Sequence, residues 1–147
     1  MTKPYQRTSI VQLVNQVMRA LIRLNLAPKG IYILSVQGRK SGRWYTTPVT
    51  LVQEKERRWL VAPYGNVAWV QNARCAGYIN LTRGRKTERV TIVEIGSVES
   101  APILKKYLAL EPIVRPYFDV HPDAALEAFV AEAPRHPVFR IQNTYGN

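Results

Sequence analysis

Short apolar runs, separated by short turns that carry glycine or charge, dominate residues 30–95 and constrain the fold more than any other feature. Five of these runs have the length and the β-branched and aromatic content of strands: residues 31–36, 44–53, 59–62, 78–83 and 88–95. A sixth, Val138-Phe139-Arg140-Ile141, lies near the end of the chain. Most connections are short enough for hairpins, which pair strands in antiparallel fashion. Six such strands with helices at the margins predict a small β-barrel of the α+β class.

Residues 9–26 have the periodicity of an amphipathic helix. Ser9 followed by Gln12 fits a capping box, and Pro28 and Gly30 end the helix. Its apolar positions share one face: Ile10, Leu13, Val14, Val17, Met18, Leu21 and Ile22. Two roles stay open. The helix covers one side of the domain, or it rests on a membrane surface through its apolar stripe and the basic residues that flank it.

Three more helices are expected. A short one begins after Asn66, its N-cap, and ends at Arg74. The other two span residues 100–110 and 123–132, and the second opens at Pro122-Asp123, where an acidic side chain stabilises the first turn.

The length of 147 residues predicts one domain, residues 1–147, with 1–28 as a helical extension and 30–142 as the barrel with its peripheral helices. A hydrophobic content of 46% excludes a disordered chain. No apolar run is long enough to span a membrane, and the N-terminus lacks the features of a signal peptide. We therefore expect a cytoplasmic protein, with attachment to the inner face of the membrane through the first helix as the alternative.

The formal net charge of +11 is concentrated in the first two thirds of the chain. Residues 1–96 hold sixteen Lys and Arg against four Asp and Glu, whereas residues 97–147 hold five against six. Such a field attracts polyanions: nucleic acid, anionic lipid, or a phosphorylated or polycarboxylated small molecule. Nucleic acid is disfavoured, because the aromatic residues beside the basic ones lie in strands that need them for the core and no nucleic-acid motif is present.

Side chains for protein-based catalysis are few. His136 lies between prolines and is expected to be structural, and the single Cys75 is expected to be a small buried thiol. With only two histidines, no metal site is expected. If the chain is an enzyme, its reactive atoms therefore come from a cofactor.

One turn suits an anionic ligand. Between the first two strands, Gly38-Arg39-Lys40-Ser41-Gly42-Arg43 combines glycines, which bring backbone N–H groups close to a ligand, with cationic side chains and a hydroxyl. This combination fits a phosphate. The alternative is a solvated hairpin turn with surface charges.

Five stretches together resemble the deazaflavin-dependent nitroreductase family, over about residues 30–142. The stretches are Gly38-Arg39-Lys40-Ser41-Gly42, Thr47-Pro48-Val49, Ala62-Pro63-Tyr64-Gly65, Trp69 with Asn72 and Ala76, and Ala133-Pro134-Arg135-His136-Pro137-Val138-Phe139. The resemblance implies a split β-barrel of the flavin-reductase type that binds coenzyme F₄₂₀, an 8-hydroxy-5-deazaflavin with a phosphate and a polyglutamate tail, in preference to FMN. The implied reaction is hydride transfer from the reduced deazaflavin to a small electron-poor acceptor such as a quinone, an enone or a nitro compound.

The resemblance also assigns roles to residues. Those of the glycine turn would hold the phosphate region: Gly38, Arg39, Lys40, Ser41 and Gly42. Arg43 would replace a phosphate contact that many members make from the position of Tyr45. The remaining residues would surround the deazaflavin: Thr47, Pro48, Val49, Ala62, Pro63, Tyr64, Gly65, Trp69 and Asn72. Tyr64 is the expected proton donor, with ring stacking as its alternative role. A homodimer and a monomer both stay open, and the other function that stays open is noncatalytic binding of a fatty acid, FMN or haem.

Overall fold

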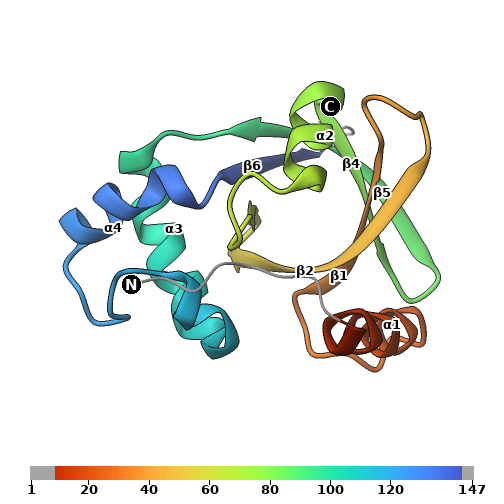
Figure 1. Ribbon diagram of the computed structural model, residues 1–147, viewed down its shortest axis with the longest axis horizontal. Helices are drawn as coiled ribbons and strands as arrows, with labels where there is room; N and C mark the ends of the chain where they lie inside the picture. The colour runs from red at the N-terminus through yellow and green to blue at the C-terminus, as the bar shows by residue number, and fades with distance from the viewer. Residues whose placement is uncertain (1–8, 144–147) are drawn as a thin grey trace.

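The computed structural model describes residues 9–143, with the side chains of residues 12–142. Within them, six strands close into a barrel in the order β1-β2-β3-β6-β5-β4, and every neighbouring pair is antiparallel (Figure 1). The strands are β1 (Ile31–Gln37), β2 (Trp44–Glu54), β3 (Arg57–Val61), β4 (Tyr78–Arg83), β5 (Lys86–Glu94) and β6 (Val138–Asn143). The predicted α+β barrel of six antiparallel strands is confirmed.

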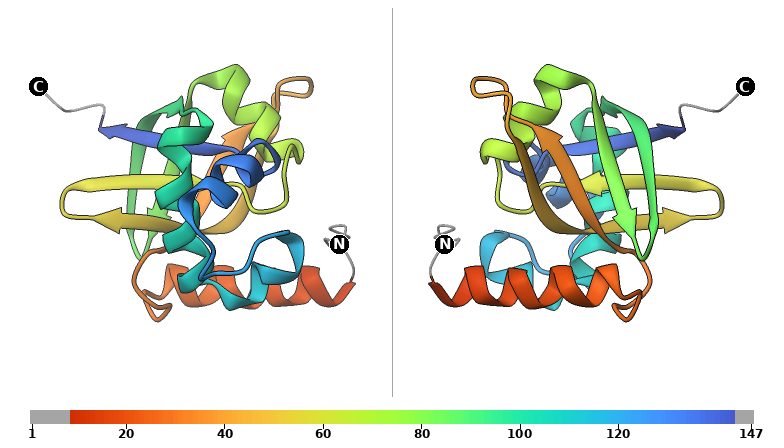
Figure 2. Two further views of the ribbon diagram at one scale, coloured as in Figure 1. Left: turned by 90° about the vertical axis from the view of Figure 1, so that its left-hand side faces the viewer. Right: turned by 90° about the vertical axis from the view of Figure 1, so that its right-hand side faces the viewer.

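Four α-helices and two 3₁₀ helices surround the barrel in the described part of the chain: α1 (Ser9–Arg23), α2 (Ala68–Ala76), α3 (Ser97–Leu110), η1 (Pro112–Tyr117), α4 (Leu126–Glu132) and η2 (Ala133–Arg135). The helices α3 and α4 pack on one side of the barrel, α1 runs beneath it, and α2 lies near one end (Figures 1 and 2). None of the described helices is long and apolar enough to cross a membrane.

Three apolar clusters hold these elements together. The barrel interior is filled by side chains from all six strands, among them Leu34, Leu60 and Phe139, which are at most 1% exposed. A second cluster joins the outer face of β3 to α3 and α4. A third, smaller cluster places Ile22 of α1 against Ile33 of β1. Each cluster removes apolar area from water, which is the main driving force for this packing.

Several predicted helix boundaries are wrong. The first helix ends at Arg23, not at residue 26, because the chain turns there, with Asn25 at a φ of 59°. The capping side chain of Ser9 lies outside the described side chains. The residue before α2 is Val67, and the amide of Asn66 instead accepts a hydrogen bond from Arg74 (2.9 Å).

The C-terminal third departs furthest from the prediction. The helix expected from residue 123 begins at Leu126, so Pro122-Asp123 lies in the preceding turn. The 3₁₀ helix η1 was not expected at all, since Pro112 and Pro116 suit short 3₁₀ turns but break the periodicity of longer helices. Cys75 was expected to be buried and is exposed, because α2 turns this side chain away from the barrel.

The apolar face of α1 is only partly covered. Near the C-terminal end of the helix, Ile22 is fully buried, whereas Leu13, Val14 and Val17 are 60%, 53% and 53% exposed. The covering role expected for this helix therefore holds for its second half. Its first half leaves an apolar stripe open.

Arg83 joins the β4–β5 hairpin to the segment that follows α1. Its guanidinium donates hydrogen bonds to the carbonyl oxygens of Ala27, Pro28 and Ile31. This side chain of the basic hairpin is therefore structural. We expect Arg83→Met to lower the free energy of unfolding by about 2 kcal/mol, because it removes three bonds from a charged donor.

Urea unfolding would measure this loss, and Arg85→Met is the matched control. Arg85 lies on the same turn and is exposed, so its loss should change stability by no more than about 0.5 kcal/mol. Equal stability of the two variants would contradict the role given to Arg83.

Candidate functional site

A cavity of about 960 Å³ lies beside the β1–β2 turn, against β2, α2 and the loop after β3. The middle of α1, the C-terminal end of α3 and the helix η1 complete its wall. It contains twelve of the residues predicted for the cofactor site: Gly38, Arg39, Lys40, Ser41, Tyr45, Thr47, Pro48, Val49, Pro63, Tyr64, Trp69 and Asn72. Residues far apart in the sequence thus meet in one hollow, and their binding of the cofactor stays a prediction.

The β1–β2 turn is closed by its own backbone. The Gly38 N–H donates to the carbonyl of Arg43 (2.6 Å), and the Gly42 N–H donates to the carbonyl of Gly38 (3.0 Å). A Cβ atom on Gly38 would lie 2.8 Å from the Tyr45 ring and 2.9 Å from Ser41 Oγ. Glycine at this position therefore allows these two side chains to close over the turn.

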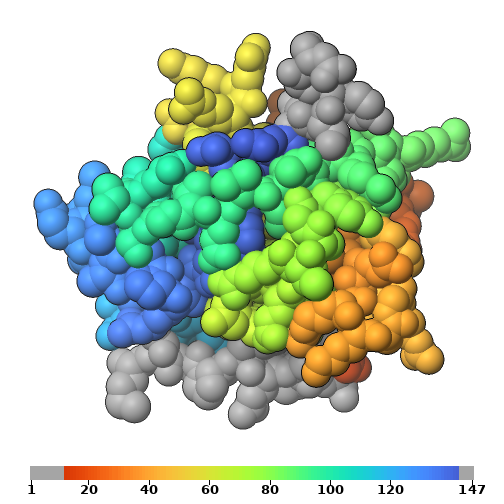
Figure 3. All heavy atoms as spheres, turned by 90° about the horizontal axis from the view of Figure 1, so that it is seen from above, coloured from red at the N-terminus to blue at the C-terminus, as the bar shows by residue number. Residues whose placement is uncertain are grey.

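Asn72 anchors the turn to α2. Seen from above, the orange atoms of the β1–β2 segment lie beside the light green atoms of α2 (Figure 3). Its side-chain oxygen accepts hydrogen bonds from the Arg39 backbone N–H (3.0 Å) and from Arg39 Nη1 (2.7 Å), and the Asn72 side chain is buried. Arg39 Nη2 also donates to Gln71 (2.9 Å). The guanidinium of Arg39 is thus oriented by α2. Lys40, in contrast, is exposed and makes no hydrogen bond or ion pair within the described residues.

The middle of β2 forms one long wall of the cavity. Thr47, Pro48 and Val49 lie there in register with Leu34, Ile33 and Tyr32 of β1. Pro48 lacks an N–H group, which suits it to a strand position that does not donate to the neighbouring strand.

Four predicted residues do not line the cavity. Ala62 is fully buried, and its N–H donates to the carbonyl of Pro137. Gly65 has a φ of +83° and belongs to the turn that carries Tyr64. Gly42, with a φ of +73°, shapes the β1–β2 turn, and Arg43 is exposed outside the cavity. Ala62, Gly65 and Gly42 therefore contribute through the backbone around the site, and the phosphate contact of Arg43 remains a prediction.

The other end of the cavity was missed in the sequence. It is lined by residues of α1, α3 and η1 and by Glu111, which lies between α3 and η1. The residues are Val14, Asn15, Met18, Tyr107, Glu111, Ile113, Val114 and Tyr117. Helical periodicity shows which of these side chains share a face, but the barrel decides which face meets the cavity. The one available signal was the concentration of tyrosine and proline between residues 107 and 117.

This second end is rich in phenols. The Tyr64 and Tyr117 rings meet edge to face, 4.8 Å apart at an angle of 79°. Burial raises the pKa of the Tyr107 phenol well above its usual range, and the nearby Glu111 and Tyr64 act in the same direction. Glu111 itself accepts a hydrogen bond from the Thr50 hydroxyl (2.8 Å). The Tyr107 phenol therefore stays neutral and remains a hydrogen-bond donor at ordinary pH.

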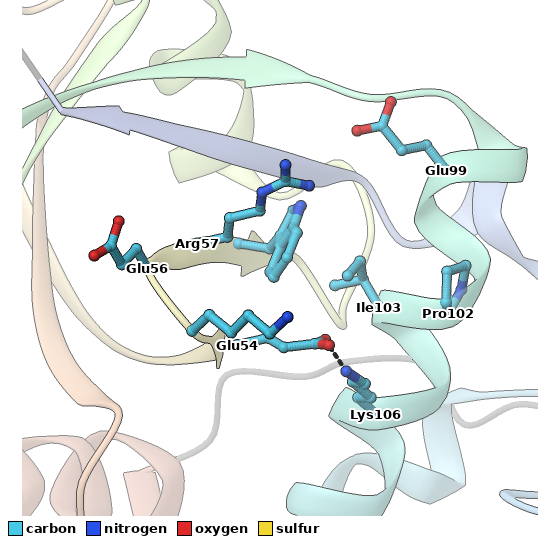
Figure 4. A pocket seen from close by; sticks show the side chains of 9 residues that line it. Glu54, Glu56, Arg57, Glu99, Pro102, Ile103 and Lys106 are labelled. Carbon is cyan, nitrogen blue, oxygen red and sulfur yellow. Dashed lines mark hydrogen bonds and ion pairs between the residues drawn. The ribbon is translucent and has the colours of Figure 1, made fainter. Parts of the chain in front are cut away.

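A second cavity of similar volume lies between the tip of the β2–β3 hairpin and α3 (Figure 4). Its labelled side chains include Arg57, Glu99 and Ile103, and Glu54 forms an ion pair with Lys106 across it. None of the predicted site residues lines this cavity. The first cavity is therefore the candidate site.

The barrel is closed and antiparallel, and a glycine-rich basic turn lies at the mouth of a partly aromatic cavity. This combination is typical of proteins that bind an extended anionic cofactor. The sequence profile of the F₄₂₀H₂-dependent quinone reductase family matches residues 7–115. The chain belongs to this family. None of the curated proteins compared with the chain matches it.

Solved structures share the fold at low sequence identity. An F₄₂₀H₂-dependent reductase is 22% identical, with 78% of this chain and 95% of that chain covered and a TM-score of 0.53. A structure described as a domain-swapped dimer is 18% identical, covering 92% and 100%, with a TM-score of 0.56. A protein of unknown function from Agrobacterium tumefaciens is 18% identical, covering 87% and 54%, with a TM-score of 0.59.

The family match confirms the resemblance seen in the sequence. The chain is an F₄₂₀-dependent reductase, so catalysis takes precedence over the noncatalytic binding that had stayed open, and F₄₂₀ takes precedence over FMN. The cavity fits such a cofactor on two observations. Lys40 lines it and has no hydrogen bond or ion pair among the described residues, and the Arg39 guanidinium beside it is oriented by Asn72.

Proposed function

We propose that the chain reduces quinones, with the cofactor held by the β1–β2 turn and the acceptor held at the tyrosine-lined end of the cavity. The observation that carries this proposal is the division of one cavity into two chemically different ends. The turn offers cations and N–H groups, which suit a phosphate. The opposite end offers apolar side chains and phenols, which suit a neutral ring with carbonyl oxygens.

The hydride for the acceptor would come from reduced F₄₂₀ bound in this cavity. In the chain itself, Lys40 and Ser41 would bind the phosphate region, and Asn72 keeps the Arg39 backbone and guanidinium in place for the same purpose. Thr47 and Val49 on one wall and Trp69 on the other would flank the flat ring system. These residues would bind and orient. None of them is a carboxylate or a histidine, as expected where the cofactor supplies the reactive atoms.

Tyr64 is the proposed proton donor to the product oxygen. It lies in the cavity wall and contacts Tyr117 of the tyrosine-lined end. Tyr107, which stays neutral, would donate a hydrogen bond to an acceptor carbonyl. Val114 would keep this end apolar, since it lines the cavity and is only 3% exposed.

The acceptor would enter past α1. The exposed apolar stripe of Leu13, Val14 and Val17 continues into the cavity at Val14 and Met18. This continuity supports peripheral contact with a membrane as the route for a lipid-soluble quinone. A homodimer also remains a proposal, supported by the structural neighbour described as a domain-swapped dimer.

The test is oxidation of F₄₂₀H₂ by the purified chain with three acceptors at equal concentration: a short-chain naphthoquinone, a cyclic enone and a nitroaromatic compound. We expect the quinone to give a kcat/KM at least about tenfold above the other two, a difference of about 1.4 kcal/mol in transition-state binding. A preference for the nitro compound would mean that the acceptors are nitro compounds and not quinones. Lack of turnover with all three, despite cofactor binding, would contradict the proposed function.

A further inference from the structure

A buried acid–base pair lies behind the cavity wall without lining it. Glu132, the last residue of α4, and His136, which follows η2, are 2% and 3% exposed. His136 Nε2 lies 2.6 Å from Glu132 Oε2, and His136 Nδ1 lies 2.8 Å from the carbonyl oxygen of Pro63. The imidazole stacks on Phe118, with 3.7 Å between ring centroids and 7° between planes.

Both nitrogens of His136 face oxygen acceptors, and this fixes the number of protons in the pair. A backbone carbonyl only accepts, so Nδ1 carries a proton. The Glu132 carboxyl group already accepts from Arg135 Nη1 (2.6 Å) and from the Asp119 N–H (3.0 Å), which is the role of an ionised carboxylate. Nε2 therefore donates to it as well. The pair holds one proton more than a neutral imidazole and a carboxylate would.

The pair connects the two halves of the aromatic contact in the cavity. On one side, His136 binds the carbonyl of Pro63, the residue before Tyr64. On the other side, Glu132 binds the N–H of Asp119 and His136 stacks on Phe118, and these two residues directly follow Tyr117. Tyr64 and Tyr117 thus each lie within two residues of an atom that the pair holds.

We propose that the protonated Glu132–His136 pair is a positioning element that holds Tyr64 and Tyr117 in the cavity wall. Loss of its extra proton would leave the Nε2 lone pair against a carboxylate in a site closed to water, and the contact to Pro63 would loosen. Its effect on catalysis rests on the proposed function, whereas its effect on the loop that carries Tyr64 does not.

Other charged and titratable groups surround the pair from each packed element. They are Arg135 on η2 and Asp119 after η1, whose backbone N–H binds Glu132. Tyr64 and Tyr117 contact each other beside the residues that the pair binds. Arg135 lies within hydrogen-bond distance of Glu132. Several groups could thus cause a change at alkaline pH in the loop that carries Tyr64. Comparing variants of Glu132 and His136 shows whether the pair causes it.

The charge state is measured directly by nitrogen NMR of the histidine rings in the protein without cofactor. The chain has two histidines, and the exposed His121 is removed in a His121→Gln control to assign the signals. We expect both ring nitrogens of His136 to carry protons at about neutral pH. A single protonated nitrogen would overturn the proposal.

Two variants then test the positioning role. Glu132→Gln can donate its amide to a neutral imidazole without the extra proton. Its NH₂ group then faces the Asp119 N–H, so the bond to the backbone after Tyr117 is lost. We expect it to lower kcat/KM near neutral pH, and to lack the alkaline fall in kcat/KM that we expect of the unaltered chain. His136→Gln loses one of the two bonds and the ring stacking, and we expect it to lower kcat/KM by about tenfold or more.

Amide hydrogen exchange at Tyr64 separates this proposal from the proposed function. Faster exchange in His136→Gln, with the doubly protonated ring in the unaltered chain, would support the positioning role even if no acceptor is reduced. Unchanged exchange at Tyr64, together with pH profiles that are identical in Glu132→Gln and the unaltered chain, would overturn it. If His136→Gln does not fold, the nitrogen NMR and Glu132→Gln still decide.

Discussion

Replacing Arg39 and Lys40 together with methionine is expected to weaken F₄₂₀ binding by about a hundredfold. Two charge-assisted contacts worth about 1.5–3 kcal/mol each would be lost, and about 1.4 kcal/mol corresponds to a factor of ten. Because Arg39 also donates to Asn72 and Gln71, its loss loosens the turn as well as removing a charge. The single Lys40→Met variant removes a charge alone and should account for about tenfold.

The control is Arg85→Met with Lys86→Met, which removes the same charge from the other basic turn, outside the candidate site. Titrations at two salt concentrations should show a weaker salt dependence for the Arg39 and Lys40 variant only. If the two double variants lose affinity equally, the general positive field binds the cofactor. If neither loses affinity, the β1–β2 turn is not part of the site.

Phe139→Ala is expected to lower the free energy of unfolding by about 3–5 kcal/mol. Phe139 is 1% exposed in the barrel interior, and its ring lies 6.5 Å from that of Trp69, between centroids. The lost side chain leaves a cavity that the closed barrel cannot collapse to fill. Since most domains are stable by only about 5–15 kcal/mol, this variant would be unfolded in a substantial fraction or close to it.

Urea unfolding measures the effect, and Val93→Ala on the neighbouring strand β5 is the control. Val93 is 37% exposed, so its truncation should cost no more than about 1 kcal/mol. A similar, small loss in both variants would mean that Phe139 does not fill the barrel. Where Phe139→Ala remains folded, its cofactor affinity should also fall, because Trp69 lines the cavity.

The strands could be predicted because their signals are local. The apolar run from Ile31, the basic turn at Gly38 and the glycine of the β4–β5 hairpin each identify their own element without reference to the rest of the chain. The twelve predicted residues that line the cavity were found in the same way, since the turn, the middle of β2 and the α2 helix each carry a short motif.

What could not be predicted depends on contacts between distant segments. Tyr107 shares a helix with exposed residues, and only the packing of α3 on the barrel brings it into the cavity. The structural role of Arg83 could not be predicted, because the three carbonyl groups that it binds are more than fifty residues away. His136 was expected to be structural, but its partner Pro63 becomes visible only in the folded chain.

The half-covered helix α1 is a second case in which contacts with distant segments could not be predicted. Its stripe of apolar residues predicts a covered face, yet the barrel offers a matching surface only near Ile22. Sequence periodicity shows which side chains share a face, but not what packs against that face. The exposure of Leu13 and Val17 was therefore found only in the structure.

The most direct test of the central claim is a titration of the purified chain with oxidised F₄₂₀ and, in parallel, with FMN, followed by tryptophan emission. Trp69 lines the cavity and reports occupation, while the exposed Trp44 and the buried Trp59 are replaced by phenylalanine to leave one signal. The account predicts saturable quenching by F₄₂₀ that weakens with salt, and no comparable quenching by FMN. Equal or tighter binding of FMN, or no binding of F₄₂₀, would contradict it.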